Sequence, residues 1–384
     1  MPLLNGPTHF GPHHPAPEQF TLDPRKRATT GDLLFCVRGS TTGRMNWADR
    51  DYAIGRGVAA IRHRAEPRLQ PLVRGVVEHS LPGLLVQATG STFPNVSADQ
   101  LANIEWPKLG FPEQRAIAQV LGTLDDKIEL NRRMDGTLEA VARALFKSWF
   151  VDFDPVRAKM EGRDTGLPQD IADLFPDRMV DSEMGEIPEG WEVKSLKDCM
   201  NLTMGQSPPG RTYNDHGDGL PFFQGRSEFG FRYPEKRRFC SAPTRAANPE
   251  DTLVSVRAPV GDINLAWERC CIGRGVAALR HKSDSSSFTY YSAWALQREL
   301  REYEHTGTVF GAINKRQFQA LKITEPDPRV VEAFHTMSES LDVRIRSNVA
   351  ESSTLSALRD TLLPRLISGE LRLAESKKAV EAEA

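Results

Sequence analysis

The sequence predicts an α+β protein in which two similar α/β domains are separated by two long antiparallel coiled-coil helices, arranged as a tandem pseudo-twofold repeat. The first observation is a twelve-residue stretch, AIGRGVAAIRHR at residues 53–64, that returns as CIGRGVAALRHK at residues 271–282. The second is that each copy is followed by a long segment with apolar residues at alternating four- and three-residue spacing. Such internal similarity indicates that the chain consists of duplicated structural units.

The length and composition are those of an ordinary multidomain globular protein. A chain of 384 residues is long enough for two or three domains, and its 39% hydrophobic and 26% charged residues are typical values. No run of 18 apolar residues occurs, and the first residues lack the basic and apolar regions of a secretory signal. We therefore expect a cytoplasmic protein without a membrane span.

The repeat extends well beyond the twelve residues. Residues 2–15 align with 221–234 and residues 31–39 with 250–258, so that Asp32 corresponds to Asp251 and Arg38 to Arg257. Residues 187–220 have no counterpart before Met1. We expect either a start codon further upstream or a first unit that has lost its opening strand or two.

Within each unit, short apolar runs between glycine, proline and aspartate predict short β-strands in an α+β arrangement with many loops. The segments SADQLANIEWP and NKRQFQALKIT predict a short capped helix that leads into a final strand of each unit. Loops held on a rigid scaffold are where recognition residues usually lie.

The two long helices are predicted from their apolar periodicity. The first helix is predicted over residues 113–150, and its apolar stripe from Ile117 to Trp149 is interrupted at Asp135 and repeated after residue 326. Sustained 3.5-residue periodicity favours a coiled coil, and Asn131 and Asn348 at equivalent positions would fix its register. Two independent surface helices with an asparagine at the edge of each stripe are the alternative. The predicted seam contains Leu121, Leu124, Ile128, Asn131, Leu138, Leu145, Leu341, Ile345, Asn348, Leu355 and Leu362.

One segment carries a family resemblance. Residues 111–156, FPEQRAIAQVLGTLDDKIELNRRMDGTLEAVARALFKSWFVDFDPV, resemble the central conserved region of the specificity (S) subunit of type I restriction–modification enzymes. TGSTFP before this segment and IPEGWEV at residues 187–193 are also similar to segments of that family. The resemblance covers nearly the whole chain, except the missing opening of the first domain and the tail after Leu373.

The resemblance implies a DNA-binding subunit without catalysis of its own. Two target-recognition domains would each read one half of a split DNA site, and the helices would dock two methyltransferase (M) subunits, joined by restriction (R) subunits. S-adenosylmethionine, ATP and Mg²⁺ are then expected on those partners, and no cofactor or metal on this chain. The implied domains are residues 1–110 (recognition domain 1, incomplete at its start), 111–155 (spacer helix), 156–186 (acidic linker), 187–325 (recognition domain 2), 326–373 (second spacer helix) and 374–384 (disordered tail).

The net charge of −2 does not by itself favour nucleic acid, but the charge is unevenly distributed. Residues 151–190 contain eleven acidic and four basic residues, whereas residues 221–282 contain eleven basic and six acidic ones. The repeated regions are therefore basic, which is compatible with surfaces for an anionic ligand or with a solvated surface of mixed charge.

Candidate DNA contacts are the arginine, lysine, amide and hydroxyl side chains of the repeated loops. For any one of them solvation at the surface is the simpler explanation, but the set on repeated loops favours DNA. We assign Arg56 and Arg274 to a structural turn that needs glycine flexibility. The candidates are Asn5, Thr8, Arg25, Lys26, Arg27, Arg38, Ser91, Thr92, Asn95, Ser97, Gln224, Arg226, Ser227, Arg232, Lys236, Arg237, Arg238, Arg257, Thr308, Asn314, Lys315, Arg316 and Gln317.

The aromatic segment LFKSWFVDFDPV allows two interpretations. Its rings are either buried within the chain or exposed as a docking site for an M subunit, since exposed apolar patches mark interfaces. The docking candidates are Phe146, Trp149, Phe150 and Phe153.

Motifs for other functions are absent. The sequence contains no phosphate-binding loop, no methyltransferase motif and no His/Cys metal spacing, and its five cysteines form no C-x-x-C pair. We therefore expect free thiols, and a stand-alone enzyme is disfavoured. The remaining alternative is an interaction protein whose heads bind proteins rather than DNA, which salt-sensitive DNA binding would distinguish.

Overall fold

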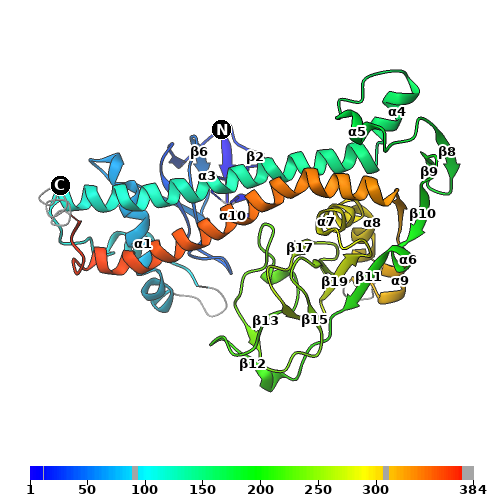
Figure 1. Ribbon diagram of the computed structural model, residues 1–384. Coiled ribbons are helices and arrows are strands. Elements are labelled where there is room, and N and C mark those ends of the chain that lie inside the picture. Colours follow the sequence, from blue (N-terminus) through cyan, green and yellow to red (C-terminus); the bar gives the residue numbers. More distant parts are fainter. Residues whose placement is uncertain (12, 89–93, 306–310, 374–384) are drawn as a thin grey trace, which may run out of the picture. The chain divides into compact units, whose positions relative to one another are not determined.

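The computed structural model describes residues 1–11, 13–88, 94–305 and 311–373. The chain divides into two compact units (Figure 1). The first contains Met1–Asp135 and Arg346–Ala384, and the second contains Gly136–Ile345. Each long helix contributes one part to each unit, so helix residues are assigned below to the unit in which they lie.

The first unit contains two small sheets. A four-stranded sheet has the order β2-β1-β6-β3, with β1 and β6 parallel, and a three-stranded antiparallel sheet has the order β5-β4-β7. The strands are β1 (Pro2–Leu4), β2 (Gln19–Phe20), β3 (Arg27–Ala28), β4 (Leu33–Cys36), β5 (Met45–Trp47), β6 (Tyr52–Ile54) and β7 (Val58–Ile61).

The second unit repeats both sheets and enlarges them. Its sheets have the orders β12-β14-β13-β18-β15 and β11-β19-β16-β17, and again two strands, β13 and β18, are parallel. Two strand pairs, β10-β20 and β8-β9, are separate. The strands are β8 (Met179–Ser182), β9 (Gly185–Pro188), β10 (Glu192–Ser195), β11 (Met200–Met204), β12 (Tyr213–Asn214), β13 (Leu220–Phe223), β14 (Phe239–Cys240), β15 (Ala246–Ala247), β16 (Thr252–Ser255), β17 (Ile263–Leu265), β18 (Cys270–Ile272), β19 (Val276–His281) and β20 (Lys322–Glu325).

The additional strands β10, β11 and β12 come from the stretch that has no counterpart in the first repeat. β10 provides the partner of β20, the predicted final strand of the second unit. The corresponding residues of the first unit, 105–108, form no strand. The predicted final strand is therefore wrong for the first unit, because among the described residues no strand is available there to satisfy its backbone groups.

Each unit also contains helices shorter than the two long ones. Two of them, α1 in the first unit and α7 in the second, follow the repeated stretch and were missed by the sequence analysis, although buried apolar residues of α1 recur at helical spacing. The predicted acidic linker contains α4, α5 and the β8-β9 hairpin. The helices are α1 (Gln70–Gln87), α2 (Ala98–Ala102), α4 (Asp154–Met160), α5 (Gln169–Ala172), α6 (Leu196–Cys199), α7 (Ser286–Ala295), α8 (Gln297–Glu302) and α9 (Lys315–Ala320), with 3₁₀ turns η1 (Pro7–His9), η2 (Pro67–Leu69), η3 (Gly210–Thr212), η4 (Arg226–Glu228) and η5 (Tyr303–His305).

The two long helices are α3 (Phe111–Phe150) and α10 (Pro328–Ile367), and each contains 40 residues, or about 60 Å of helix. In the first unit Asp125 of α3 accepts a hydrogen bond from Arg359 of α10. In the second unit Phe146 of α3 packs against Phe334 of α10. As the residue number rises along α3, the number of the contacting residue on α10 falls, so the two helices are antiparallel (Figure 1).

The centre of the helix pair is more polar than the predicted seam. Asp135 is 3% exposed and accepts a hydrogen bond from Asn348 Nδ2 at 2.7 Å, and Glu139 is 6% exposed. The predicted interruption of the apolar stripe at Asp135 is therefore confirmed, and the buried amide of Asn348 satisfies this carboxylate. Of the predicted seam, Leu121, Ile128, Asn131, Ile345 and Asn348 are buried, whereas Leu124, Leu138, Leu145, Leu341, Leu355 and Leu362 are half-buried.

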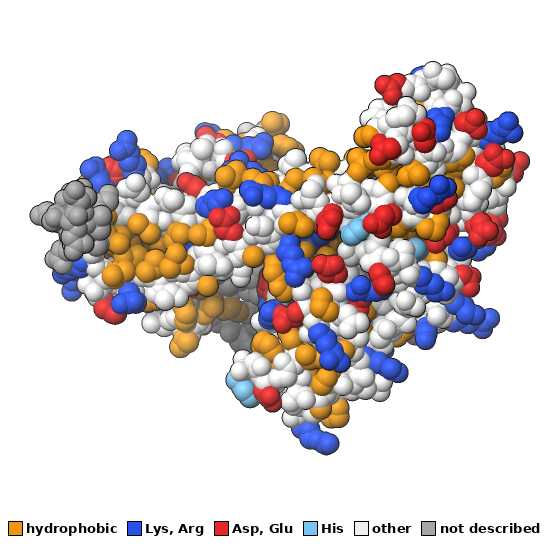
Figure 2. All heavy atoms as spheres, viewed as in Figure 1, with side chains coloured by type: hydrophobic (Ala, Val, Ile, Leu, Met, Phe, Trp, Pro, Cys, Tyr) orange, Lys and Arg blue, Asp and Glu red, His pale blue; other side chains and the backbone are white. Residues whose placement is uncertain are grey.

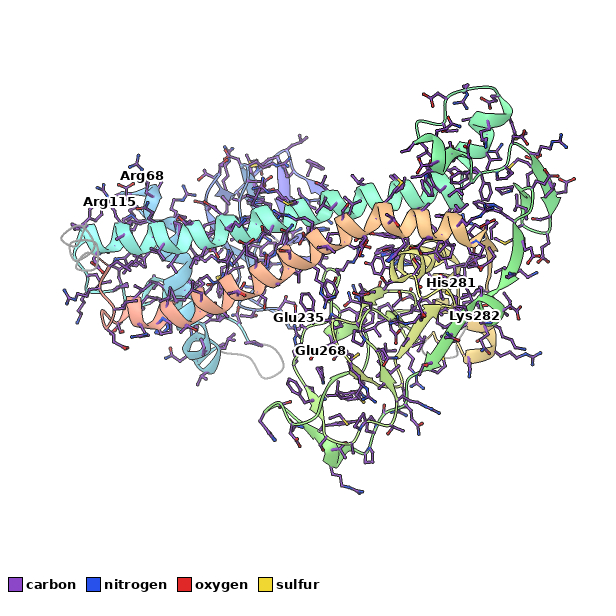
Figure 3. The ribbon with its side chains drawn as sticks, in the orientation of Figure 1. Arg68, Arg115, Glu235, Glu268, His281 and Lys282 are labelled. Atoms are coloured by element: carbon purple, nitrogen blue, oxygen red, sulfur yellow. The ribbon has the colours of Figure 1, made fainter. Side chains whose placement is uncertain are left out.

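The second arginine of the repeated stretch, Arg62 or Arg280, has an equivalent partner in both units. Arg62 donates to the buried carboxylate of Asp32 at 2.6 Å, and Arg280 donates to that of Asp251 at 2.6 Å. His281, labelled in Figure 3, is buried, and its Nε2 lies 3.2 Å from a carboxylate oxygen of Glu325. The second arginine of each repeated stretch and, in the second unit, His281 therefore stabilise the scaffold.

Candidate nucleic-acid interface

In each unit, loops meet at the carboxyl end of the parallel strand pair. In the second unit Gly275 N donates to the carbonyl of Gln224 at 3.1 Å, and Gly275 O accepts from Val256 N at 2.9 Å. Gln224 follows β13, Val256 follows β16, and Gly275 lies between β18 and β19. These hydrogen bonds bring three loops together at one edge of the domain.

The first unit repeats this arrangement. Val37 N donates to Gly57 O at 3.0 Å, and a β-carbon added at Gly57 would overlap the carbonyl oxygen of Asn5. One at Gly275 would overlap the carbonyl oxygen of Gln224. Neither glycine has a positive φ. The predicted turns are present, since Val58 N donates to Gly55 O and Val276 N donates to Gly273 O. The glycines in them are required for close approach of two backbones, and the predicted need for glycine flexibility is wrong.

Each of these edges presents exposed basic and amide side chains. We call this surface of each unit its loop edge. It presents the exposed side chains of Asn5, Arg38 and Arg56 in the first unit, and of Gln224, Arg257 and Arg274 in the second. The segments that carry Arg38 and Arg257 each form an isolated β-bridge, with Asn95 and Ala312 respectively. The loop edge combines side chains that suit phosphate with side chains that suit base edges.

Four other basic candidates of the second unit are exposed and lie in ion pairs. Arg226 pairs with Asp262 at 2.5 Å, Lys236 with Glu268, Arg237 with Glu235 at 2.5 Å and Arg238 with Asp215 at 3.8 Å. Figure 3 labels Glu235 and Glu268, and Figure 2 shows basic and acidic side chains mixed over this unit. Exposed pairs contribute little stability, so these cations can exchange a carboxylate for a phosphate.

Three candidates have a structural role at helix starts. Ser97 accepts a hydrogen bond from Gln100 N at 3.1 Å and caps α2. Asn314 and Gln317 form the reciprocal cap of α9, with both hydrogen bonds at 3.0 Å. A side chain that already caps a helix is less available to a base.

The remaining polar candidates are mostly exposed. Asn5 Nδ2 donates to Gln19 Oε1 at 3.2 Å, and Ser227 Oγ donates to Glu228 at 2.6 Å. Ser91, Thr92 and Thr308 lie outside the described residues. Thr8, Arg25, Lys26, Arg27, Lys315 and Arg316 are exposed, and Asn95 is half-buried.

The assignment of Arg232 to DNA is wrong. Its side chain is 1% exposed and forms ion pairs with Glu139 of α3 and with Asp342 of α10. Burial raises the pKa of Glu139, and the guanidinium beside it opposes that effect. A side chain enclosed in this way cannot reach a nucleic acid.

The docking role of the aromatic segment is also wrong. Phe146, Trp149, Phe150 and Phe153 are at most 7% exposed. They pack against rings of the second unit, including Phe334 of α10, with centroid distances of 5.5 Å to Phe146 and 5.3 Å to Phe150. Burial within the chain, the other interpretation of these rings, is what the structure shows.

All five cysteines are free and buried, and burial raises the pKa of Cys199, Cys270 and Cys271 to about 12. In the described ranges, histidine, cysteine and carboxylate side chains form no metal-binding group of three. No described helix is both long and apolar enough to cross a membrane.

Comparison with known proteins gives the family. No family model matches the chain. It is 30% identical over 285 residues to a protein provisionally named the specificity subunit of the type I restriction enzyme MjaX of Methanocaldococcus jannaschii. That alignment covers 73% of this chain but 62% of the relative, less than two thirds of its length. The HindI specificity subunit of Haemophilus influenzae is 27% identical over 348 residues, which cover 75% of this chain and 73% of the relative.

These similarities, which cover 73% and 75% of this chain, make it a relative of type I restriction enzyme specificity subunits. A crystal structure of a type I restriction–modification S subunit from M. genitalium shares the fold, with a TM-score of 0.55, 16% identity and coverage of 95% of this chain and 88% of that one. The predicted resemblance to specificity subunits and the predicted fold class are therefore confirmed.

Proposed function

We propose that this specificity subunit recognises a split, asymmetric DNA sequence, with each unit reading one half. The observation that carries the proposal is the loop edge, which is built on the same strand ends and hydrogen bonds in both units. Arg38 and Arg257, like Arg56 and Arg274, are the same residue in both edges and suit phosphate contacts. Asn5 and Gln224 differ between the edges and suit base contacts, because amide side chains discriminate adenine through paired hydrogen bonds.

In this proposal the long helices set the spacing between the half-sites. Each helix is about 60 Å long, and half-site spacing in other two-headed readers follows from the geometry that links the heads. The buried hydrogen bond between Asn348 and Asp135 supports a single register for the helix pair, since a polar pair would be broken by a shift along the helix.

We further propose that the exposed apolar residues of the long helices dock two methyltransferase subunits, in place of the buried aromatic segment. Leu130 and Val141 on α3 are 48% and 51% exposed, and Val343 and Leu358 on α10 are 59% and 45% exposed. Exposed apolar side chains favour protein interfaces. In this proposal the partner subunits carry S-adenosylmethionine, ATP and Mg²⁺. The methyltransferase subunits methylate adenine N6, and the complex with restriction subunits cleaves DNA, both in the cytoplasm.

The deciding experiment is a map of N6-methyladenine in a genome after co-expression of this chain with its methyltransferase subunit. We expect a split motif with one modified adenine on each strand, absent when either chain is expressed alone. Salt-dependent binding of the purified complex to duplexes that carry the motif provides the independent check.

A purified complex of this chain and the methyltransferase subunit that leaves no methylation would contradict the proposal. Salt-insensitive binding to the same duplexes would favour the alternative, an interaction protein that does not use its basic loops for DNA.

A further inference from the structure

Arg232 is the most deeply enclosed charge of the second unit. It lies in the loop after η4, five residues beyond Ser227, and its side chain is 1% exposed. Its Nη2 donates to Asp342 of α10 at 2.5 Å, and its Nη1 donates to Glu139 of α3 and, at 2.9 Å, to Tyr291 Oη. One guanidinium therefore connects a loop of the recognition domain to both long helices.

Aromatic rings and a serine also contact this network. Its Cζ lies 4.2 Å from the centre of the Tyr290 ring and 5.5 Å from that of Tyr291. Ser287 Oγ donates to Asp342 at 2.5 Å and so holds the acceptor carboxylate from the other side. A planar group with donors in a fixed fork satisfies two carboxylates at once, which a lysine ammonium cannot do from the same position.

The backbone between Arg232 and residues 224–226, which we call the reading loop of the second unit, is also held by hydrogen bonds. Gln224 N and Gly225 N donate to Glu228 Oε2 at 3.2 and 3.0 Å, and Leu265 N of β17 donates to the carbonyl of Arg232 at 2.8 Å. The path from β13 through the reading loop to the buried arginine is therefore short and hydrogen-bonded. A change in the position of Arg232 would be transmitted to Gln224 and Arg226.

The first unit lacks this connection. The position equivalent to Arg232 is His13, whose Nδ1 lies 3.5 Å from Glu129 of α3. At that distance the contact is too long for a good hydrogen bond, and a neutral imidazole makes no ion pair. Burial lowers the pKa of His13 to about 4, with His14 and Arg74 acting in the same direction. The first recognition domain is thus held to α3 without a fixed charge at this point.

We infer that Arg232 is a specificity-determining positioning residue: it holds the second reading loop at a fixed orientation to the helix pair, so that the second half-site is read at one spacing. The inference rests on the proposed function, since it concerns how the second unit reads its half-site. The inference involves no contact between Arg232 and DNA. Arg232 acts through Gln224 and Arg226, so the two half-sites should respond differently to the same kind of substitution.

The test is to map N6-methyladenine for the native chain, Arg232→Lys and Tyr291→Phe, each co-expressed with the methyltransferase subunit. Tyr291→Phe keeps the ring and both carboxylates, so it serves if Arg232→Lys does not fold. We expect both variants to keep the first half of the motif, to lose discrimination in the second half by about tenfold, and to accept spacers one base pair longer or shorter. Arg329→Lys is the matched control, because that arginine also pairs with a carboxylate, Asp327, but is exposed.

The outcomes separate the two proposals. No methylation by the native chain overturns the proposed function. A native split motif that both folded variants reproduce, with the same spacer and the same discrimination, overturns the inference. Equal loss of discrimination in both halves also overturns it, because that pattern indicates general destabilisation rather than orientation of one loop.

Discussion

The two units have the same seven strands but are attached to the long helices by different chemistry. The second unit places the buried Arg232 between two carboxylates, whereas the first has His13 at the same position, near one. Among the described residues, the second unit also has six further strands, β8 to β12 and β20. The duplicated domains have therefore retained their backbone contacts, whereas the side-chain contacts that join each domain to the long helices have diverged.

The largest difference between the units is expected on loss of the buried arginine. Arg232→Met leaves Glu139 and Asp342 without their guanidinium, and breaking a buried ion pair costs about 3–5 kcal/mol. His13→Ala removes a neutral side chain and should cost about 1 kcal/mol or less. Denaturant titration followed by hydrogen exchange, which reports the two units separately, measures both effects.

Arg329→Met is the control for the loss of an arginine. Its pair with Asp327 is exposed, so we expect no measurable change. If Arg232→Met also left the free energy of unfolding unchanged, the ion pairs of Arg232 with Glu139 and Asp342 would not stabilise the second unit.

The second prediction concerns a feature that the units share. Gly57→Ala and Gly275→Ala should each destabilise their unit by about 1–3 kcal/mol, because the added methyl group overlaps a backbone carbonyl that cannot move freely. Gly6→Ala and Gly225→Ala are matched controls, since a β-carbon at either position meets nothing within 4 Å. Urea midpoints for the four variants provide the measurement, and a cost in only one unit would show that the loop edges are not equivalent.

The third prediction concerns His13, which can change its protonation state at moderately acidic pH, whereas its counterpart Arg232 cannot. The pKa of His13 is lowered to about 4 in the folded chain from an ordinary value of 6.5. The unfolded chain therefore binds more protons between these values, and the stability that depends on neutral His13 is present above pH 6.5 and is lost as the pH falls toward 4. We expect a loss on the order of 1–2 kcal/mol, which His13→Gln should abolish in urea titrations at pH 7 and pH 5.

The second unit provides the control for this prediction. Arg232, at the equivalent position, remains charged throughout that range. A pH dependence that His13→Gln leaves intact would have to come from another group.

The smallest effects are expected at the loop edges. Arg38→Ala, Arg56→Ala, Arg257→Ala and Arg274→Ala should each weaken DNA binding to a similar extent for all sequences and reduce the slope of log Kd against log salt by about 1. Gln224→Ala should instead change which bases are accepted. Titrations at several salt concentrations measure both, and an unchanged slope for all four arginines would exclude the loop edge as a phosphate-binding surface.

The repeat, the strands that contain it and the two long helices could be predicted from the sequence, because repeated residues and apolar spacing are local signals. The structure shows that the second arginine of the repeated stretch pairs with a buried aspartate in each unit, as with Arg62 and Asp32. The short helices α1 and α7 were missed, although buried residues of α1 such as Leu72, Val73 and Val76 follow helical spacing.

The candidate site was less predictable, since charge and aromatic character do not reveal burial. Arg232 and its exposed neighbour Arg237 are alike in sequence, and only the approach of Glu139 and Asp342 distinguishes them. Asn314 looks like a base-reading amide until the helix that it caps is seen.

By itself, the sequence determined that the chain is a duplication of α/β units joined to amphipathic helices and that it resembles specificity subunits, because these properties lie in patterns along the chain. Only the tertiary structure decided which polar residues are free to meet a ligand. Burial and ion pairing depend on segments far apart in the sequence, as with Glu139, Arg232 and Asp342, and no local pattern specifies that meeting.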